Sequence, residues 1–410
     1  MKILKSKLNG KIKLCPSKSY AHRYLIASML SKGKSIISNV DMSDDIKATL
    51  SCIKSYDRKY EIDGDRVIFY EDDKIFKNKR IDEGSVIFNA IESGSTLRFF
   101  LPLAVHKYKD VLFTGSKKLM ERGVGVYEKI LTKVYFDKRE NEIALYGDIE
   151  PDEYIIPGNI SSQYATGLLF LLPLLKKNSV IKIVGNLESK NYALITLDVL
   201  HQFGIDIDIG NQTIFDKNIN LVSFNILGNS EYKATDKVVE GDYSNAAFID
   251  AFNYFGSSIS IDGLNKNSVQ GDKIYKEYFE KLDKNYCTLD ISDCIDLGPI
   301  LMAFATLKNG AHLMGTRRLK IKESNRANVM AEELNKFGAD IEIDDNDIYI
   351  NKTELHSPNE ILSSHNDHRI VMALTLFSTM FDIEISGESA VNKSYPSFFE
   401  DLNDVGLNIL

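Results

Sequence analysis

Residues Gly315–Asp340, GTRRLKIKESNRANVMAEELNKFGAD, contain the transition on which the fold prediction depends. Over residues 318–322, apolar and cationic side chains alternate, which predicts a strand with three cations on one face. Ser324 precedes a run with apolar residues at helical spacing, so it is the predicted N-cap of a helix. Gly338 follows the last apolar residue and predicts the end of that helix. The stretch therefore predicts a strand, a turn and a helix.

Cations gather at the predicted start of this helix. Lys322 precedes the helix, and Arg326 lies in its first turn, where the helix dipole disfavours positive charge. Glu323 is a lone carboxylate between them. An anionic ligand would explain the arrangement, because backbone N–H groups at a helix N-terminus already attract negative charge. A solvated basic surface is the alternative, which this stretch alone leaves open.

Length and composition indicate an ordinary globular protein with two domains. The chain has 410 residues, which at about 200 residues per domain predicts two. Its hydrophobic share of 44% and charged share of 26% allow an ample core. The net charge of −8 argues against nucleic acid or an anionic membrane as the principal partner. No apolar run suits a signal peptide or a membrane span, so we expect a cytoplasmic protein.

The cysteines give no sign of a metal site. Cys15, Cys52, Cys287 and Cys294 form no CxxC pair and have no histidine at metal-ligand spacing. We interpret them as reduced, mostly buried thiols, and we expect no metal.

Six segments of the chain share one pattern, in which a small polar or charged cluster precedes an apolar helical run and a short β-rich run. The segments begin at Pro16, Glu92, Ser161, Asp242, Asp296 and Asn366. Their spacing is irregular, so each is a supersecondary module rather than a turn of a short-period solenoid. Three modules per half predict two similar α/β domains, residues 15–236 and residues 1–14 plus 237–410.

The polar clusters at the heads of the predicted helices are the candidate functional residues. They comprise Lys18, Ser19 and Arg23; Ser93, Gly94, Ser95 and Arg98; Ser161, Ser162 and Gln163; and Asp367, His368 and Arg369. Arg122 and Lys393 add isolated cations on loop-like segments. Structural roles are the alternative, since Ser161 and Ser162 could be ordinary N-caps and His368 a buried structural histidine. Such structural roles do not explain why cations recur in the first turns of helices that otherwise belong to the core.

Taken together, ten short motifs resemble the EPSP synthase family of enolpyruvyl transferases. From Pro16 to about Leu402, and in the family's order, they are PSKSYAHR, ESGSTLR, LMER, SSQ, SKNY, GDYSNAA, IDLGPILMAFA, RLKIKESNR, NDHRIVMA and KSYPSFFEDL. The resemblance implies an α/β (α+β) fold of two globular domains, each of three βαβαββ repeats, in the inside-out α/β barrel of this family. It also implies that residues 15–236 form the shikimate 3-phosphate side and that the active site lies in the cleft between the domains.

The resemblance also implies a reaction. The family joins phosphoenolpyruvate to the 5-hydroxyl of shikimate 3-phosphate and releases phosphate, without a metal or an organic cofactor. By similarity, Asp296 would be the base near the 5-hydroxyl, Glu323 would manage the methylene proton, and Lys18 would lie between both substrates. Both substrates carry a phosphate and a carboxylate, which explains the need for many cations.

Further binding residues follow from the same motifs. The implied ligands of shikimate 3-phosphate are Lys18, Ser19, Arg23, Ser161, Ser162, Gln163, Ser189, Asp296 and Lys322. Those of phosphoenolpyruvate are Lys18, Gly94, Arg122, Gln163, Arg326, Arg369 and Lys393.

The sequence departs from the commonest family pattern at five positions. Glu92 stands where Asn is usual, and Asn325 replaces an Asp, which removes a charge partner from the following arginine. Gly123 stands where Pro is usual, which predicts a looser loop. Ser17 and His22 replace a common Gly and the usual Asn. None removes a residue that the implied mechanism needs.

Two other functions remain as alternatives. A UDP-N-acetylglucosamine enolpyruvyl transferase would share the fold, but it typically uses a cysteine near GSKKLMERG, and this chain has none between Cys52 and Cys287. A non-catalytic anion-binding relative would be expected to lose Lys18, Asp296 or Glu323, and all three are present. We therefore expect a monomer that acts on phosphoenolpyruvate and shikimate 3-phosphate, without nucleic acid or membrane partners.

Overall fold

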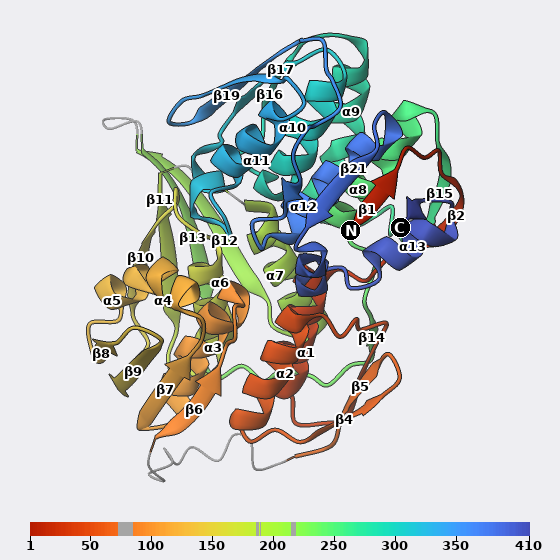
Figure 1. The fold of residues 1–410 in the computed structure, drawn as a ribbon. Helices are drawn as coiled ribbons and strands as arrows, with labels where there is room; N and C mark the ends of the chain where they lie inside the picture. The colour runs from red at the N-terminus through yellow and green to blue at the C-terminus, as the bar shows by residue number, and fades with distance from the viewer. Residues whose placement is uncertain (73–84, 186–187, 189, 215–218) are drawn as a thin grey trace. The chain divides into compact units, whose positions relative to one another are not determined.

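The structure is a computed structural model that describes residues 1–72, 85–185, 188, 190–214 and 219–410. The chain forms two compact units (Figure 1). One comprises Lys18–Val239, and the other combines Met1–Ser17 with Glu240–Leu410. Within the described part of the chain, no helix is both long enough and apolar enough to cross a membrane.

The Lys18–Val239 unit repeats one sheet topology. Its four-stranded sheets have the orders β14-β3-β5-β4, β6-β7-β9-β8 and β10-β11-β13-β12. In each sheet the first pair is parallel and the other pairs are antiparallel. A βαβαββ repeat makes this pattern, because a parallel pair needs a crossover helix whereas an antiparallel pair needs only a hairpin. The strands are β3 (Ser35–Ser38), β4 (Tyr60–Asp63), β5 (Arg66–Phe69), β6 (Val86–Asn89), β7 (Asp110–Thr114), β8 (Val134–Lys138), β9 (Glu142–Gly147), β10 (Glu153–Pro157), β11 (Ser179–Val184), β12 (Ile207–Ile214), β13 (Ile219–Ile226) and β14 (Lys237–Val238).

Two helices of this unit belong almost wholly to its core. The helices are α1 (Lys18–Met29), α2 (Asp44–Ser55), α3 (Gly94–Lys107), α4 (Lys117–Arg122), α5 (Gly125–Ile130), α6 (Gln163–Leu171) and α7 (Lys190–Gln202). Beyond its first residue α6 is buried on every face, and α3, which contacts it, is buried from Thr96 to Val105. Both helices are apolar nearly all round, and such helices are stable only inside a domain. The polar groups of these two helices are therefore available to a ligand only at the helix ends.

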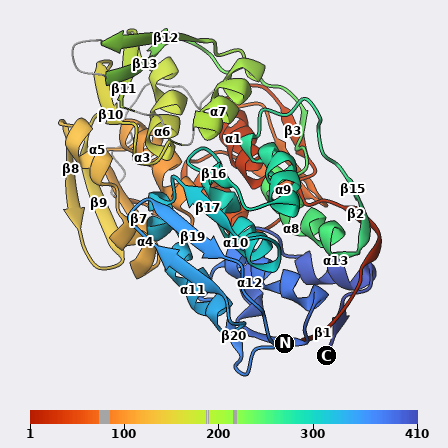
Figure 2. The same cartoon turned by 90° about the horizontal axis from the view of Figure 1, so that it is seen from above.

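The second unit has the same topology in two of its sheets. The orders are β16-β17-β19-β18 and β20-β21-β1-β22, and β2 forms a separate parallel pair with β15. The strands are β1 (Lys2–Leu4), β2 (Asn9–Lys13), β15 (Ser258–Asp262), β16 (Thr288–Asp290), β17 (Ala311–Met314), β18 (Asp340–Ile343), β19 (Asp347–Asn351), β20 (Leu362–Ser363), β21 (Ile383–Ser386) and β22 (Asn408–Ile409). The two termini meet in one sheet, because β1 pairs with both β21 and β22 (Figure 2).

Several helices of the second unit are almost wholly buried. The helices of this unit are α8 (Tyr243–Asp250), α9 (Tyr275–Lys284), α10 (Gly298–Leu307), α11 (Arg326–Asn335), α12 (His368–Thr375) and α13 (Phe398–Asp404). Nearly all of α10 and all of α12 are buried, and the two contact each other. The mixed α/β architecture with two repeat-built units confirms the predicted fold class.

The strand predicted over residues 318–322 is wrong. Residues Arg317–Ile321 form a 3₁₀ turn, η6, after the chain leaves β17 at Gly315 with a left-handed φ of 76°. Of the two apolar residues, Leu319 is buried against Gly298 at the start of α10, whereas Ile321 is 55% exposed. Alternation had suggested that both would face the core. The anchoring of one side chain against α10, rather than strand pairing, determines the local conformation.

The predicted N-cap of α11 is one residue too early. Asn325 is the N-cap, and its side chain accepts a hydrogen bond from the Asn328 N–H. The Ser324 hydroxyl instead donates to Asp367 at 2.9 Å. The helix ends at Asn335, and the chain turns at Gly338 with a φ of 85°, as the position of this glycine predicts.

Candidate active site

Arg326, the first residue of α11, is bound by three carboxylates. It is 1% exposed and donates to Asp296 at 2.9 Å, to Glu323 at 2.6 Å and to Asp367 at 2.9 Å. These carboxylates raise the pKa of Arg326 despite the opposing effect of burial. The loss of a charge partner predicted from Asn325 is therefore offset, because Arg326 draws one partner from the neighbouring Glu323 and two from other segments.

Asp296 lies in η5 (Ile295–Leu297), immediately before α10, and is surrounded by cations. Besides Arg326, the Lys322 ammonium lies 3.1 Å and an Arg369 guanidinium nitrogen 3.3 Å from its carboxylate oxygens. Burial alone would raise the pKa of Asp296, but Arg369, Lys322 and Arg326 hold it well below its usual range. Burial also lowers the pKa of Lys322, which Asp296 partly opposes.

We call Asp296, Lys322, Glu323, Arg326, Asp367 and Arg369 the Arg326 cluster. Asp367 caps α12 by accepting from the Arg369 N–H, so the helix start and the cluster share one carboxylate. Lys393, at the end of η8 (Glu388–Lys393), reaches the loop before α12 and donates to the Asn366 carbonyl at 2.7 Å. His368 is buried beside Asp367. The structure thus brings together six residues that the sequence analysis named in this unit, with Lys393 on the adjoining loop.

Two guanidinium groups lie beside Gly94, the first residue of α3. One belongs to Arg98 of the same helix, and the other to Arg122 at the end of α4. A Cβ atom placed on Gly94 would lie 3.0 Å from a nitrogen of Arg98 and 3.2 Å from one of Arg122. Gly94 therefore leaves room beside both cations and lets the helix N-terminus approach a ligand. Arg98 also donates to the Gln163 side chain at 2.5 Å. We call Gly94, Arg98, Arg122 and Gln163 the Gly94 cluster.

The turn that carries Arg122 is held through the Gly123 carbonyl. That oxygen accepts from Arg98 at 3.1 Å and from the Tyr164 hydroxyl at 3.2 Å. Gly123 has a φ of 65°, which proline cannot adopt because its ring fixes φ near −65°. The replacement noted in the sequence thus changes the backbone conformation of this turn. Glu92, the other departure here, is half-buried just before α3.

The start of α6 carries the predicted serines. The Ser161 hydroxyl, one residue before the N-cap Ser162, accepts from the Gln163 N–H at 3.3 Å. Ser162 is buried, and its side chain makes no capping hydrogen bond. Gln163 completes the link to α3 by donating to Ser95 at 3.0 Å. Ser189 lies outside the described residues.

Two cationic side chains of α1, Lys18 and Arg23, contact the neighbouring helices. Lys18 forms a 2.9 Å ion pair with Asp45 of α2. Arg23 donates to the Ser19 carbonyl at 2.8 Å and to the Thr196 hydroxyl at 2.8 Å, and burial lowers its pKa to about 10. Arg23 therefore joins α1 to α7 as well as being a candidate ligand.

Several contributors were given no individual role in the sequence analysis. Arg98 and Asp367 were named only as parts of helix-head clusters, and Asp45 was not named. Asp272 is fully buried and accepts from Ser244, and burial together with Asp296 raises its pKa to about 7. Asp45 lies in the first turn of α2 and Asp272 in a short 3₁₀ turn, where an acid gives no sign of its distant partners, so only the packing could have identified them.

One group of metal-ligating side chains occurs among the described residues, comprising Glu332, Glu333 and His365. Glu333 is already engaged by Lys336 at 2.9 Å, by His365 at 2.8 Å and by the Ser363 N–H at 2.9 Å. This carboxylate is satisfied by protein groups, so we assign no metal to it.

Comparison with known proteins identifies the family. Residues 4–402 match the family model described as EPSP synthase (3-phosphoshikimate 1-carboxyvinyltransferase). The chain belongs to the EPSP synthase family. It is 38% identical to the 3-phosphoshikimate 1-carboxyvinyltransferase of a Clostridium perfringens strain, over 98% of this chain and 97% of that protein. It is 36% identical to the enzyme of the same name from Clostridioides difficile, over 99% and 97%.

Solved structures of EPSP synthase support the fold. The structure of the Acinetobacter baumannii EPSP synthase at 2.37 Å has a TM-score of 0.78 and 19% identity, and the match covers 99% of this chain and 98% of that chain. A second A. baumannii EPSP synthase structure has a TM-score of 0.75. At this identity the likeness concerns the fold alone.

Proposed function

We propose that this chain transfers the enolpyruvyl group of phosphoenolpyruvate to the 5-hydroxyl of shikimate 3-phosphate, with release of phosphate. This reaction belongs to the shikimate pathway of aromatic amino acid biosynthesis. The observation that carries the proposal is the Arg326 cluster. In it, Asp296 and Glu323, the two groups proposed as base and acid, share one buried arginine. Family membership over nearly the whole chain points to the same reaction.

The reaction needs a base and an acid of this kind. The 5-hydroxyl oxygen bonds to C2 of phosphoenolpyruvate, the hydroxyl proton passes to Asp296, and the methylene carbon gains a proton from Glu323. The tetrahedral adduct then loses phosphate, which takes the proton held by Asp296, while Glu323 takes a proton back from the new methyl group and the double bond is restored. Because its cations keep the pKa of Asp296 low, this carboxylate is ionised and able to accept a proton at neutral pH.

The substrate anions are assigned to the cationic groups. We assign phosphoenolpyruvate to Gly94, Arg122, Arg326, Arg369 and Lys393, and shikimate 3-phosphate to Ser19, Arg23, Ser161, Ser162, Ser189 and Lys322. Lys18 and Gln163 are assigned to both. Arginine suits phosphate and carboxylate because its planar fork can donate two parallel hydrogen bonds. The Gly94 cluster supports this assignment, since it combines two guanidinium groups with a helix N-terminus.

Lys18 is held ready by Asp45. Their 2.9 Å ion pair is only partly exposed, so the ammonium group is oriented before substrate arrives. We propose that an incoming phosphate or carboxylate shares this ammonium with Asp45. We also propose that the enzyme is a cytoplasmic monomer, because a single chain contains both clusters; sedimentation of the purified protein tests its oligomeric state.

The assignment is tested by phosphate release from purified protein and phosphoenolpyruvate, with shikimate 3-phosphate in one reaction and UDP-N-acetylglucosamine in another. We expect release only with shikimate 3-phosphate. Asp296→Asn and Glu323→Gln, which keep side-chain shape, should each lower kcat by at least about 100-fold. Asp345→Asn, which changes an exposed carboxylate, is the matched control. Release only with the UDP sugar would reject the proposal.

A further inference from the structure

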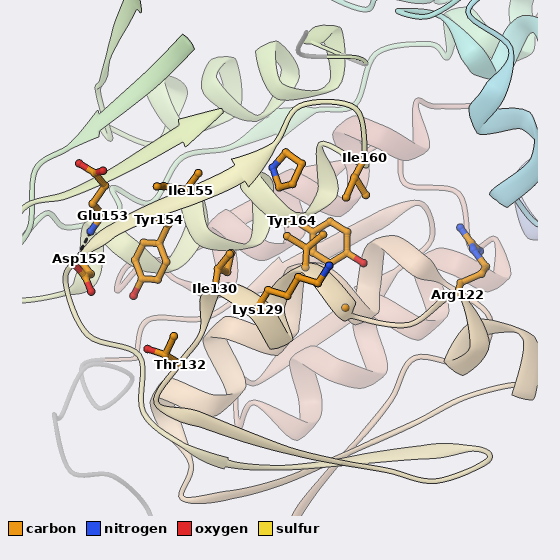
Figure 3. Close-up of a pocket in the computed structure, with 13 residues that line it drawn as sticks. Arg122, Lys129, Ile130, Thr132, Asp152, Glu153, Tyr154, Ile155, Ile160 and Tyr164 are labelled. Carbon is orange, nitrogen blue, oxygen red and sulfur yellow. Dashed lines mark hydrogen bonds between the residues drawn. The ribbon is translucent and has the colours of Figure 1, made fainter. Parts of the chain in front are cut away.

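The Lys18–Val239 unit contains a cavity of about 660 Å³ (Figure 3). It lies between α5, the edge strand β10 and Tyr164 near the start of α6. Its volume falls within the range of small-molecule pockets, roughly 300–1,000 Å³. It meets the Gly94 cluster only at Arg122, so most of its wall is distinct from the residues assigned to the substrates.

The wall has an apolar part and one available cation. Ile130, Ile155 and Ile160 line the cavity together with Tyr154. Ile155 is 53% exposed, although it projects from the centre of a strand. Across the described residues, Lys129 makes no hydrogen bond or ion pair, and Figure 3 shows its amino group directed toward Tyr164. An apolar surface beside an uncompensated ammonium group suits an amphipathic anion.

The opposite end of the cavity is acidic. Asp152 and Glu153 lie there, beyond Tyr154 in Figure 3. Glu153 forms a 2.7 Å ion pair with Lys182. Among the described residues, the side chain of Asp152 accepts a hydrogen bond only from the Glu153 N–H. These carboxylates repel an anionic head group, which therefore binds at the Lys129 end with its apolar body toward Ile130 and Ile155. The charges thus define both the class and the orientation of a ligand.

We propose that this cavity is a binding site for a small carboxylate with a flat apolar body, held by Lys129. β10 supplies a further attraction, because it is the outer strand of its sheet and leaves backbone N–H and C=O groups unpaired on that edge. An α-amino acid binds more weakly than the matching plain carboxylate, since its ammonium group would lie beside Lys129.

Occupancy of the site changes the Arg122 turn. α5, which carries Lys129, begins at Gly125 directly after that turn, and Tyr164 binds the Gly123 carbonyl. A ligand that contacts α5 and Tyr164 therefore contacts both groups that hold the turn in place. The KM for phosphoenolpyruvate should change when the site is filled, a consequence that rests on the proposed function.

The binding test is calorimetric titration of the full, substrate-free chain with 3-phenylpropionate, which does not require catalysis. We expect saturable binding at one site, weaker binding of L-phenylalanine, and about a tenfold loss of affinity in Lys129→Gln. Ile155→Trp, which fills the cavity from an exposed position, should abolish binding. Lys133→Gln is the control, because Lys133 is an exposed lysine paired with Glu150 outside the cavity.

Two results would overturn the proposal. One is the absence of saturable binding by the parent chain. The other is unchanged affinity in both Lys129→Gln and Ile155→Trp, which would place the probe elsewhere, for example among the substrate-binding cations. If the probe binds but phosphate release is never observed, the site stands and the proposed reaction fails.

Discussion

The ammonium nitrogen of Lys322 lies 3.1 Å from a carboxylate oxygen of Asp296. This contact links the residue assigned to a substrate anion with the residue assigned to proton abstraction. The two side chains therefore influence each other's charge, and the pH dependence of the reaction should report it.

Lys322→Met should move the acidic limb of the kcat/KM profile to higher pH. Asp296 must be ionised to accept a proton, and its pKa rises when one of its three cationic neighbours is removed. Activity is therefore lost at a higher pH as the solution is acidified. We also expect roughly a ten- to hundredfold lower kcat/KM for shikimate 3-phosphate from loss of a charge-assisted contact. Lys320→Met, whose exposed ammonium pairs with Asp345, should leave the profile in place.

Arg326→Ala should destabilise its unit strongly. The substitution leaves Asp296, Glu323 and Asp367 close together without the cation that joins them. Breaking a buried ion pair costs about 3–5 kcal/mol in the free energy of unfolding. Urea denaturation measures this loss, and Arg317→Ala, which removes an exposed arginine, should change the midpoint far less. Equal midpoints for the two variants would contradict the structural role of Arg326.

His22→Asn should reduce acid lability. His22 is fully buried beside Thr49, and burial lowers its pKa to about 3. Between this value and the unfolded pKa of about 6.5, the unfolded chain binds a proton that the native chain does not. Stability therefore falls as the pH falls through this window, by at most about 4–5 kcal/mol.

The check for His22 is the slope of unfolding free energy against pH from about 6.5 to 3.5. The slope should be smaller in His22→Asn than in the parent, even if the variant is less stable throughout. His201→Asn is the control, since its imidazole is 75% exposed. A parent and variant with the same slope would show that His22 is not the acid-sensitive group.

Asp272→Asn should have its largest relative benefit at alkaline pH. Burial and the nearby Asp296 raise the pKa of Asp272 to about 7, so the native chain retains a proton that the unfolded chain loses above about 4. Stability of the parent therefore falls as the pH rises from about 4 to 7. The neutral amide lacks this titration and can still accept from Ser244.

Thermal midpoints at pH 5 and pH 8 test Asp272. The midpoint of the variant relative to the parent should be higher at pH 8 than at pH 5. Asp262→Asn, which changes an exposed carboxylate paired with Lys11, is the matched control. A midpoint difference that does not vary with pH would exclude Asp272 as a buried neutral acid.

Arg98→Lys should raise the KM for phosphoenolpyruvate by about tenfold, with a smaller effect on the KM for shikimate 3-phosphate. Arg98 contacts Gln163 and the Gly123 carbonyl at the same time, which one ammonium group cannot reproduce. The Arg122 turn then loses a support. Steady-state kinetics measure both constants, and Arg139→Lys on the surface is the control. A uniform loss of kcat without a change in KM would argue against a positioning role.

Local patterns account for what could be predicted. The apolar helical runs of the six repeated segments predicted helices of the core, and the repeated order of helix and strand predicted the fold class, because both depend on periodicity within short segments. Cations at helix starts likewise predicted Arg326 and Arg369, since their conflict with the dipole is visible in sequence. Family motifs then supplied the expected roles of Lys18, Asp296 and Glu323.

The partners of these residues were decided by tertiary structure. Arg326 binds Asp296 and Asp367, which are 30 and 41 positions away, and Lys18 binds Asp45 on another helix. No local pattern encodes such distances. Packing of Leu319 against Gly298 also replaced the predicted strand by a 3₁₀ turn. The sequence by itself determined which segments are core and which residues carry charge, because these are properties of each segment. Only the tertiary structure decided which charges meet, because burial removes water and leaves each charged group dependent on the partners that the fold brings to it.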